Sequence, residues 1–245
     1  MKITFLGTSH GKPEKNRFCT STVITVAGKH YIIDAGAPIM DLLQRYEFAF
    51  EDIAGIFITH THLDHIAGLP LFTQAMNSPL RYFDISIPAF IPEAERCHEM
   101  FRFIYGAPEF KGRVHYQVYE EGRIFEDEHV RITSIRTQHN ECSYAFVIEA
   151  EGKRVVFTGD LRKDLSDYPA VILESEKPLD LVVMEAAHQL YDQDYVGNVL
   201  KNSRTQRMLI HHVAEHRNPL SCIQSTIEKF TFPAEVAYDG MTVEL

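Results

Sequence analysis

The chain has 245 residues, of which 45% are hydrophobic, so it can bury a large core and form a single domain over residues 1–245. Its 34 acidic residues outnumber 24 basic ones, and the net charge of -10 argues against a broad binding surface for nucleic acid. No apolar run of about eighteen residues occurs, and the N-terminus lacks the features of a signal peptide. We therefore expect a soluble cytoplasmic protein with no membrane contact, in which the four scattered cysteines are free thiols.

The first half of the chain predicts strands that alternate with helices. Lys2–Leu6 is expected to be a strand, and the stretch Gly7–Thr20 a loop over the end of a sheet. Ser21–Ala27 and His30–Asp34 predict a hairpin around Gly28 and Lys29. The remaining elements are a strand containing Phe57 and Ile58, a strand over Leu80–Ile87 ended by Pro88, and helices over Ile39–Tyr46, Ile66–Met76 and Pro92–Tyr105.

The second half is richer in strands. They are predicted over Val114–Tyr119, Val130–Arg136, Tyr144–Glu149, Arg154–Thr158, Leu179–Glu185 and Met208–His211, with short strands on either side of Asp239-Gly240. Helices are expected over Asp192–Arg204 and Pro219–Phe230. This order suits an α+β fold in which two sheets pack together with helices outside.

Four metal-ligand side chains follow the strand that contains Phe57, in the stretch THTHLDH. His60 and His62 are two residues apart, so in an extended segment their imidazoles point the same way and can hold one cation. Asp64 and His65 lie at the start of the next helix, offset toward a second position. A lone pair of histidines is usually a solvated or core feature, but this denser cluster at a strand-to-helix turn favours two metal ions side by side.

This HxHxDH pattern resembles that of the metallo-β-lactamase-fold hydrolases, and the resemblance extends in order along nearly the whole chain. The family's further motif residues match Asp34 in YIIDAG, His139 in RTQHN, Asp160 in VVFTGD and His212 in MLIHHV. The resemblance implies a four-layer αββα sandwich. It assigns His60, His62 and His139 to one metal, Asp64, His65 and His212 to the other, and Asp160 to both. Asp34 would orient the ligands from behind, or alternatively cap the following helix.

Imidazole and carboxylate ligands favour two divalent ions, Zn²⁺ first, with Mn²⁺ and iron as the other candidates. In two-metal sites the ions lie about 3.5 to 4 Å apart and lower the pKa of a bridging water toward ~7. The resulting hydroxide would attack phosphorus or a carbonyl carbon, and Asp64 is placed to accept or orient its proton.

Further residues are candidates for contact with the substrate. Glu185 and His188 follow a strand that should end near the metals, so His188 is predicted to be the general acid or a phosphate contact, although a surface histidine is the alternative. His216 lies four residues after His212 and is a second candidate for substrate contact. In the first loop the candidates, suggested by related phosphodiesterases, are His10, Lys12 and Arg17, and a solvated turn is an equal alternative.

Within the family, the opening KITFLGTSHG and the acid at Asp160 resemble the branch of ribonuclease Z and small phosphodiester hydrolases. Met184-Glu185-Ala186-Ala187 stands where ribonuclease Z has His-Glu-Ala-Thr, and only a short hairpin lies where its tRNA-binding arm commonly is. A phosphodiesterase for a small substrate, in a chain that can form a homodimer, is therefore the first prediction. The alternatives are a lactone or carboxylic-ester hydrolase, a tRNA 3'-processing endonuclease, and a metal-binding scaffold without catalysis.

Overall fold

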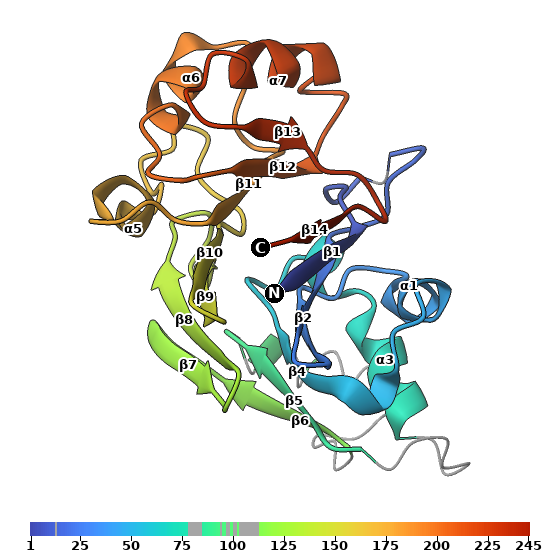
Figure 1. The fold of residues 1–245 in the computed structure, drawn as a ribbon. Coiled ribbons are helices and arrows are strands. Elements are labelled where there is room, and N and C mark those ends of the chain that lie inside the picture. The colour runs from blue at the N-terminus through green and yellow to red at the C-terminus, as the bar shows by residue number, and fades with distance from the viewer. Residues whose placement is uncertain (13, 78–84, 94, 97–98, 100–101, 103–112) are drawn as a thin grey trace.

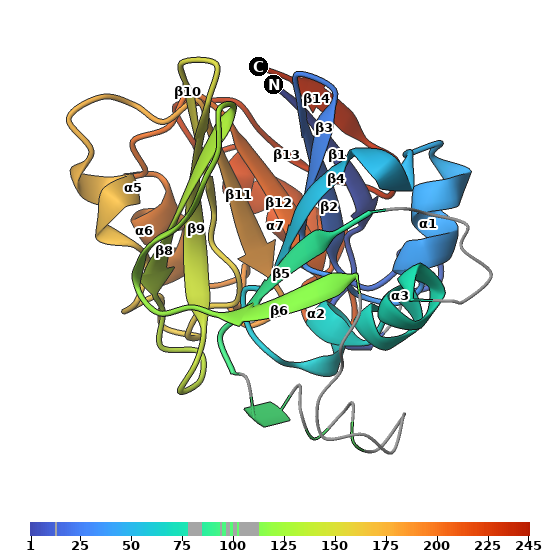
Figure 2. The same ribbon diagram turned by 90° about the horizontal axis from the view of Figure 1, so that it is seen from below.

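A computed structural model of the protein describes residues 1–12, 14–77, 85–93, 95–96, 99, 102 and 113–245. Within these ranges two sheets lie face to face, and helices cover the outer face of each (Figure 1). The same four layers are visible from below (Figure 2). The arrangement confirms the predicted α+β sandwich.

The first sheet has the strand order β14-β1-β2-β3-β4-β5-β6. Its strands are β1 (Lys2–Gly7), β2 (Ser21–Val26), β3 (Lys29–Ile33), β4 (Ile53–Phe57), β5 (Ile87–Ile91), β6 (Val114–Val118) and β14 (Thr242–Glu244). From β3 to β6 the neighbours are parallel, which requires a crossover connection between each pair. The predicted hairpin is present as β2 and β3, with its turn at Ala27 and Gly28, both of which have positive φ.

The second sheet has the strand order β13-β12-β11-β10-β9-β8-β7. Its strands are β7 (Gly122–Glu126), β8 (Val130–Arg136), β9 (Tyr144–Ala150), β10 (Lys153–Phe157), β11 (Leu181–Ala186), β12 (Met208–Val213) and β13 (Ala234–Val236). Strands β7 to β10 form an antiparallel meander, and β10 to β13 are parallel.

Helices cover the outer faces of both sheets. They are α1 (Ile39–Arg45), a short 3₁₀ turn (Phe50–Asp52), α2 (Leu63–Ile66), α3 (Leu69–Met76), α5 (Ala170–Glu174), α6 (Asp194–Leu200) and α7 (Leu220–Ile227). α1 and α3 lie outside the first sheet, and α5, α6 and α7 outside the second (Figure 1). None of the helices in the described part of the chain is long and apolar enough to cross a membrane.

Alternation along the strands divides the apolar residues between the layers. In β3, Tyr31 and Ile33 face the other sheet, while Ile32 packs under the helices of the first half. In β11, Val183 faces the middle, while Met184 packs under the helices of the second half. Both faces are buried, and for this reason the strands read as nearly continuous apolar runs.

Some predicted elements differ from the structure. The strand near Pro88 is Ile87–Ile91, so the prediction that Pro88 ends a strand is wrong. Pairing with β4 starts only at Ala89, and the missing N–H of Pro88 therefore removes no bond from that ladder. The single helix predicted after the start of the ligand motif is divided into two helices, α2 and α3. It is interrupted at Ala67 and Gly68, before Pro70.

Other differences concern elements with weak sequence patterns. The strand β7 was not predicted because it is a polar edge strand, and α5 was not predicted because it has only five residues. The predicted strands on either side of Asp239-Gly240 are present as β13 and β14, and they join different sheets, β13 the second and β14 the first. The carboxylate of Asp239 accepts hydrogen bonds from Thr8 and Phe18 and holds this crossing segment.

Two predictions fall largely on residues outside the described part. These are the strand Leu80–Ile87, whose first five residues are not described, and the helix Pro92–Tyr105. Of this predicted helix, Pro92 and Glu93 are described and are not helical, whereas Glu95, Arg96, Glu99 and Arg102 are helical and exposed. Cys19, Cys142 and Cys222 are free, and Cys97 is outside the described residues.

Candidate metal centre

The carboxyl ends of the parallel strands meet at one edge of the sandwich. Asp34 follows β3 and His60 lies three residues after β4, while Asp160 follows β10 and His188 follows β11. His212 is the fifth residue of β12 and has a positive φ of 51°. Segments that lie far apart in the sequence thus deliver polar side chains to the same place, as is common at this edge of α/β sheets.

The first predicted group of ligands lies together. His62 Nδ1 is 3.0 Å from His60 Nε2 and 3.1 Å from His139 Nε2. Asp160 Oδ2 is 3.6 Å from both His60 Nε2 and His139 Nε2. A tetrahedral zinc site with bonds of about 2.0 to 2.1 Å has ligand atoms about 3.3 Å apart. The spacing of these four atoms therefore suits one ion at their centre.

The second predicted group also lies together, on the other side of Asp160. His212 Nε2 is 3.0 Å from Asp64 Oδ2 and 3.2 Å from His65 Nε2. Asp160 Oδ1 is 3.5 Å from His65 Nε2 and 3.4 Å from His212 Nδ1. One carboxylate oxygen of Asp160 thus faces each group, which is the arrangement that a bridging ligand requires.

The polar atoms of the centre fit bound cations better than they fit each other. Asp160 Oδ1 and His212 Nδ1 are buried and have no hydrogen-bond partner among the described residues. Burial disfavours the ionised form of Asp160, but the surrounding histidines hold the pKa of its carboxyl well below its usual value. Burial lowers the pKa of His60 and of His139, so these imidazoles are neutral, as metal ligands must be.

Asp34 holds the centre from behind. Its Oδ1 accepts hydrogen bonds from the Thr59 backbone at 2.8 Å and the Thr59 hydroxyl at 3.0 Å, and its Oδ2 lies 2.8 Å from His65 Nδ1. The proton of His65 is therefore on Nδ1, and Nε2 faces His212 and Asp64. Helix α1 begins after Pro38 with no side-chain cap, so Asp34 does not cap it. Its φ of 58° shows that the backbone adopts a strained conformation to place this carboxylate.

We expect Asp34→Asn to weaken metal binding at the second group by about 10- to 100-fold, the usual effect of changing an outer partner of a ligand. The amide oxygen would take the bonds from Thr59, and the NH₂ group would then face His65 Nδ1. That contact requires the proton of His65 on Nε2, where it blocks coordination. Competition with a chromophoric chelator measures the affinity, and Asp41→Asn on the exposed face of α1 is the matched control. Equal affinities in the two variants would contradict this role.

His188 is held by Glu185, which is fully buried. Glu185 Oε1 lies 3.1 Å from His188 Nδ1 and accepts a bond of 2.7 Å from Gln189 Nε2, while its Oε2 accepts from the Ala187 and His188 backbones. Burial lowers the pKa of His188, but the hydrogen bond and charge of Glu185 outweigh it and raise the pKa to about 9. His188 therefore carries a proton at neutral pH, and its Nδ1 is also 3.6 Å from Asp160.

The loop between β1 and β2 lies against the second group. A Cβ built on Gly11 would be 3.3 Å from the Asp64 carboxyl carbon, and the ring of His10 is 6.4 Å from that of His212. Lys12 is exposed.

Arg17 instead turns inward and binds Glu215, the Thr8 hydroxyl and the Ala237 carbonyl, so it anchors the loop and is not free for a substrate. His216 lies beside His10, with ring centroids 5.0 Å apart and ring planes tilted by 35°.

A cavity of about 410 Å³ opens beside the centre. It is lined by Gln138, His139, Leu161, Arg162, Lys163, Asp164 and His188. The volume is within the range of about 300 to 1,000 Å³ that small-molecule sites have. Arg162 and Lys163 were not among the predicted residues, although two basic residues immediately after Leu161 and close to Asp160 were a usable signal.

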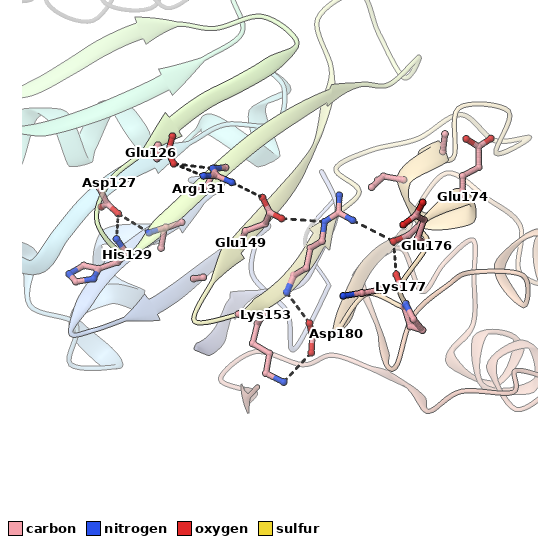
Figure 3. Close-up of a pocket in the computed structure, with 18 of the residues that line it drawn as sticks. Glu126, Asp127, His129, Arg131, Glu149, Lys153, Glu174, Glu176, Lys177 and Asp180 are labelled. Carbon is pink, nitrogen blue, oxygen red and sulfur yellow. Dashed lines mark hydrogen bonds and ion pairs between the residues drawn. The ribbon is translucent and has the colours of Figure 1, made fainter.

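A larger cavity of about 870 Å³ contains none of the predicted site residues. Charged side chains line it (Figure 3). Lys153 Nζ is 3.0 Å from Asp180 Oδ1, and Arg131 Nη1 is 3.7 Å from Glu149 Oε2. Asp180 precedes β11, whereas His188 follows this strand, so the cavity lies at the opposite edge of the second sheet.

Comparison with known proteins agrees with this fold. YhfI from Bacillus subtilis, described as a metallo-beta-lactamase fold protein, has a TM-score of 0.78 and 19% identity and covers 99% of each chain. Human tRNase Z, short form (ELAC1), has a TM-score of 0.74 and 20% identity, covering 100% of this chain and 99% of its own. The ribonuclease Z of Methanothermobacter thermautotrophicus is 33% identical over 159 residues, which are 64% of this chain but only 50% of that relative.

The protein thus has the metallo-β-lactamase fold that the resemblance predicted, and its sequence is similar to that of ribonuclease Z. One neighbour of this fold, PqqB from Methylobacterium extorquens, is Zn²⁺-bound, and the His and Asp clusters of this chain have ligand atoms close enough together to hold an ion. More particularly, the chain belongs to the anti-Pycsar protein Apyc1 family, whose model matches residues 1–219.

Proposed function

We propose that this protein is a dinuclear metal-dependent phosphodiesterase that hydrolyses a small phosphodiester. The observation that carries the proposal is the position of Asp160, whose Oδ2 faces one group of ligand atoms and whose Oδ1 faces the other. The protonated His188 lies beside the same carboxylate. Two cation positions with an acid next to them suit two-metal cleavage of a phosphodiester.

When bound, two divalent ions supply Lewis-acid stabilisation of the phosphate and an activated water at neutral pH. The protein's own residues perform the proton transfers. Asp64 is ionised, because His212 and His65 lower the pKa of its carboxyl against the effect of burial, and it orients or accepts the proton of the attacking water. His188 donates its proton to the leaving oxygen. Arg162 and Lys163 add positive charge at the cavity, which favours an anionic substrate.

The size of the cavity also favours a small substrate over a folded RNA. Its volume of about 410 Å³ suits a nucleotide-sized ligand. Met184, at the position of the ribonuclease Z motif histidine, is fully buried in the outer core, so no side chain from that position reaches the centre. Because the matched relatives are named ribonuclease Z, cleavage of precursor tRNA is the second candidate function.

We expect the purified protein to contain close to two transition-metal ions per chain, with Zn²⁺ the first candidate and Mn²⁺ or iron the others. The reason is that His60, His62, His139 and Asp160 form one group of ligand atoms and Asp64, His65 and His212 another, with Asp160 Oδ1 3.5 Å from His65 Nε2 of the second. Elemental analysis measures the content, and activity after chelation and addition of each metal measures the dependence. A metal-free protein that gains no activity with Zn²⁺ or Mn²⁺ would overturn the dinuclear proposal.

The substrate class is tested by turnover of a panel on metal-reconstituted protein. The panel contains bis(p-nitrophenyl) phosphate, cyclic nucleotides, a precursor tRNA and acyl lactones. We expect hydrolysis of the small phosphodiesters, with the highest kcat/KM among them. A higher kcat/KM on lactones would instead identify an ester hydrolase, and efficient cleavage of the precursor tRNA would identify a tRNA-processing endonuclease.

A further inference from the structure

A second cluster of ligand-type side chains lies outside the dinuclear centre, between two segments that are distant in the sequence. His10 and Glu14 belong to the loop between β1 and β2, and His216 follows β12. Glu14 Oε1 is 3.6 Å from His10 Nε2 and 3.5 Å from His216 Nδ1. One ligand atom from each residue lies within 4.8 Å of the other two, which a single ion can span.

The chemical states of the cluster suit a cation. Burial lowers the pKa of His10, which keeps its imidazole neutral. Burial opposes ionisation of Glu14, but the hydrogen bonds from His216 and from the Glu215 backbone lower the pKa of its carboxyl overall. Two imidazoles and one carboxylate are a donor set that Zn²⁺ uses in proteins, with the fourth position left to water.

His10 Nε2 gives a separate indication that a partner is missing. This atom is buried, points toward Glu14, and has no hydrogen-bond partner among the described residues. An unpaired buried polar atom is costly, by about 1 to 3 kcal/mol. An ion between His10 and Glu14 would satisfy it, since the separation of 3.6 Å is too long for a good hydrogen bond but ordinary for two ligands of one zinc ion.

We propose that His10, Glu14 and His216 form a third divalent-cation site, suited to Zn²⁺, that fastens the loop between β1 and β2 to the segment after β12. The site is weaker than the dinuclear centre for two reasons. The side chain of His216 is 44% exposed, and the Lys12 N–H donates to His10 Nδ1 at 3.3 Å. Coordination through His10 Nε2 moves the ring proton to Nδ1 and ends this long hydrogen bond, and coordination through His216 Nδ1 ends its 3.5 Å hydrogen bond to Glu14.

The site would act on the loop, not on the reacting atoms. Gly11, between His10 and Glu14, lies against Asp64 of the dinuclear centre. An ion at the cluster would therefore fix the part of the loop that covers the second group of ligands. The proposal does not depend on the reaction that the dinuclear centre performs.

Zinc stoichiometry at rising free Zn²⁺ tests the proposal, by equilibrium dialysis in zinc buffers followed by elemental analysis. The wild type should take up its tightly bound ions first and one more ion at higher free Zn²⁺. Glu14→Gln should still bind the tight ions, but its affinity for the additional zinc ion, which is the last step of uptake, should be lowered at least tenfold. Glu215→Gln is the matched control, because the Glu215 side chain pairs with Arg17 and only its backbone contacts Glu14. It should keep the last step.

The outcomes separate this site from the dinuclear centre. A wild type that binds no ion beyond the tight ones would overturn the third site and leave the proposed phosphodiesterase untouched. So would a Glu14→Gln variant that keeps the last step at wild-type affinity. The tight ions could instead be absent from the wild type and from both variants, while the wild type and Glu215→Gln still bind one ion that Glu14→Gln does not bind. In that case the dinuclear proposal fails and the third site stands. His10→Ala with unchanged circular dichroism gives a second variant in which the last step should disappear.

Discussion

Asp160→Ala should abolish hydrolysis of phosphodiesters, because Asp160 is the one described side chain with an oxygen facing each group of predicted ligands. The loss of kcat/KM should exceed the roughly 10- to 100-fold that changes outside the ligand shell cost. Asp64→Ala should have an effect of the same kind, since it removes a predicted ligand and the group that orients the water proton. Steady-state kinetics and elemental analysis of the same preparations measure the losses of activity and of metal.

Two further variants make this test specific. Asp160→Asn keeps the shape of the side chain but removes its charge, so it separates the loss of a bridging anion from the loss of packing. Asp180→Ala removes a carboxylate of the same sheet that pairs with Lys153 in the remote cavity, and it should keep activity (Figure 3). Activity of Asp160→Ala within tenfold of wild type, a barrier change of only ~1.4 kcal/mol, would contradict the bridging role.

His188→Ala should lower kcat by about 10² to 10⁴, the usual contribution of general acid catalysis, without removing metal. The effect should be large for substrates with alkoxide leaving groups. It should shrink for bis(p-nitrophenyl) phosphate, because p-nitrophenolate leaves without a proton. Glu185→Gln is the companion variant, since it removes the carboxylate that raises the pKa of His188 while keeping an acceptor next to Nδ1.

The pH profile gives a second measure of the same role. The acid works in its protonated form, so the wild-type rate on alkoxide substrates should fall as pH rises through the pKa of His188. The fall in rate should be centred no higher than about pH 9, because bound cations beside the His188 ring lower its pKa from the value of about 9. It should be absent in His188→Ala. Equal losses on both classes of leaving group, or loss of metal, would mean that His188 binds substrate or metal and that His216 is the next candidate for the acid.

The sequence was sufficient for the features that local spacing controls. His60, His62, Asp64 and His65 lie within six residues, and a strand followed by a helix places them at one edge whatever the rest of the chain does. Nearly continuous apolar runs likewise predicted most of the strands, because both faces of each sheet are covered. The errors fell on β5, where a proline was read as a strand end, and on the polar edge strand β7.

Contacts between distant segments were decided by tertiary structure alone. Asp64 and His212 are 148 residues apart, and the sequence contains no information on which imidazole nitrogen faces which oxygen. The same holds for Arg17, which is occupied by Glu215. These contacts arise only when the two sheets pack on a shared core and bring the carboxyl ends of β4, β10 and β12 together. Ligand types therefore follow from the local sequence. Their division into two groups around Asp160 was implied by the family resemblance, and the packing of the sandwich is its physical cause.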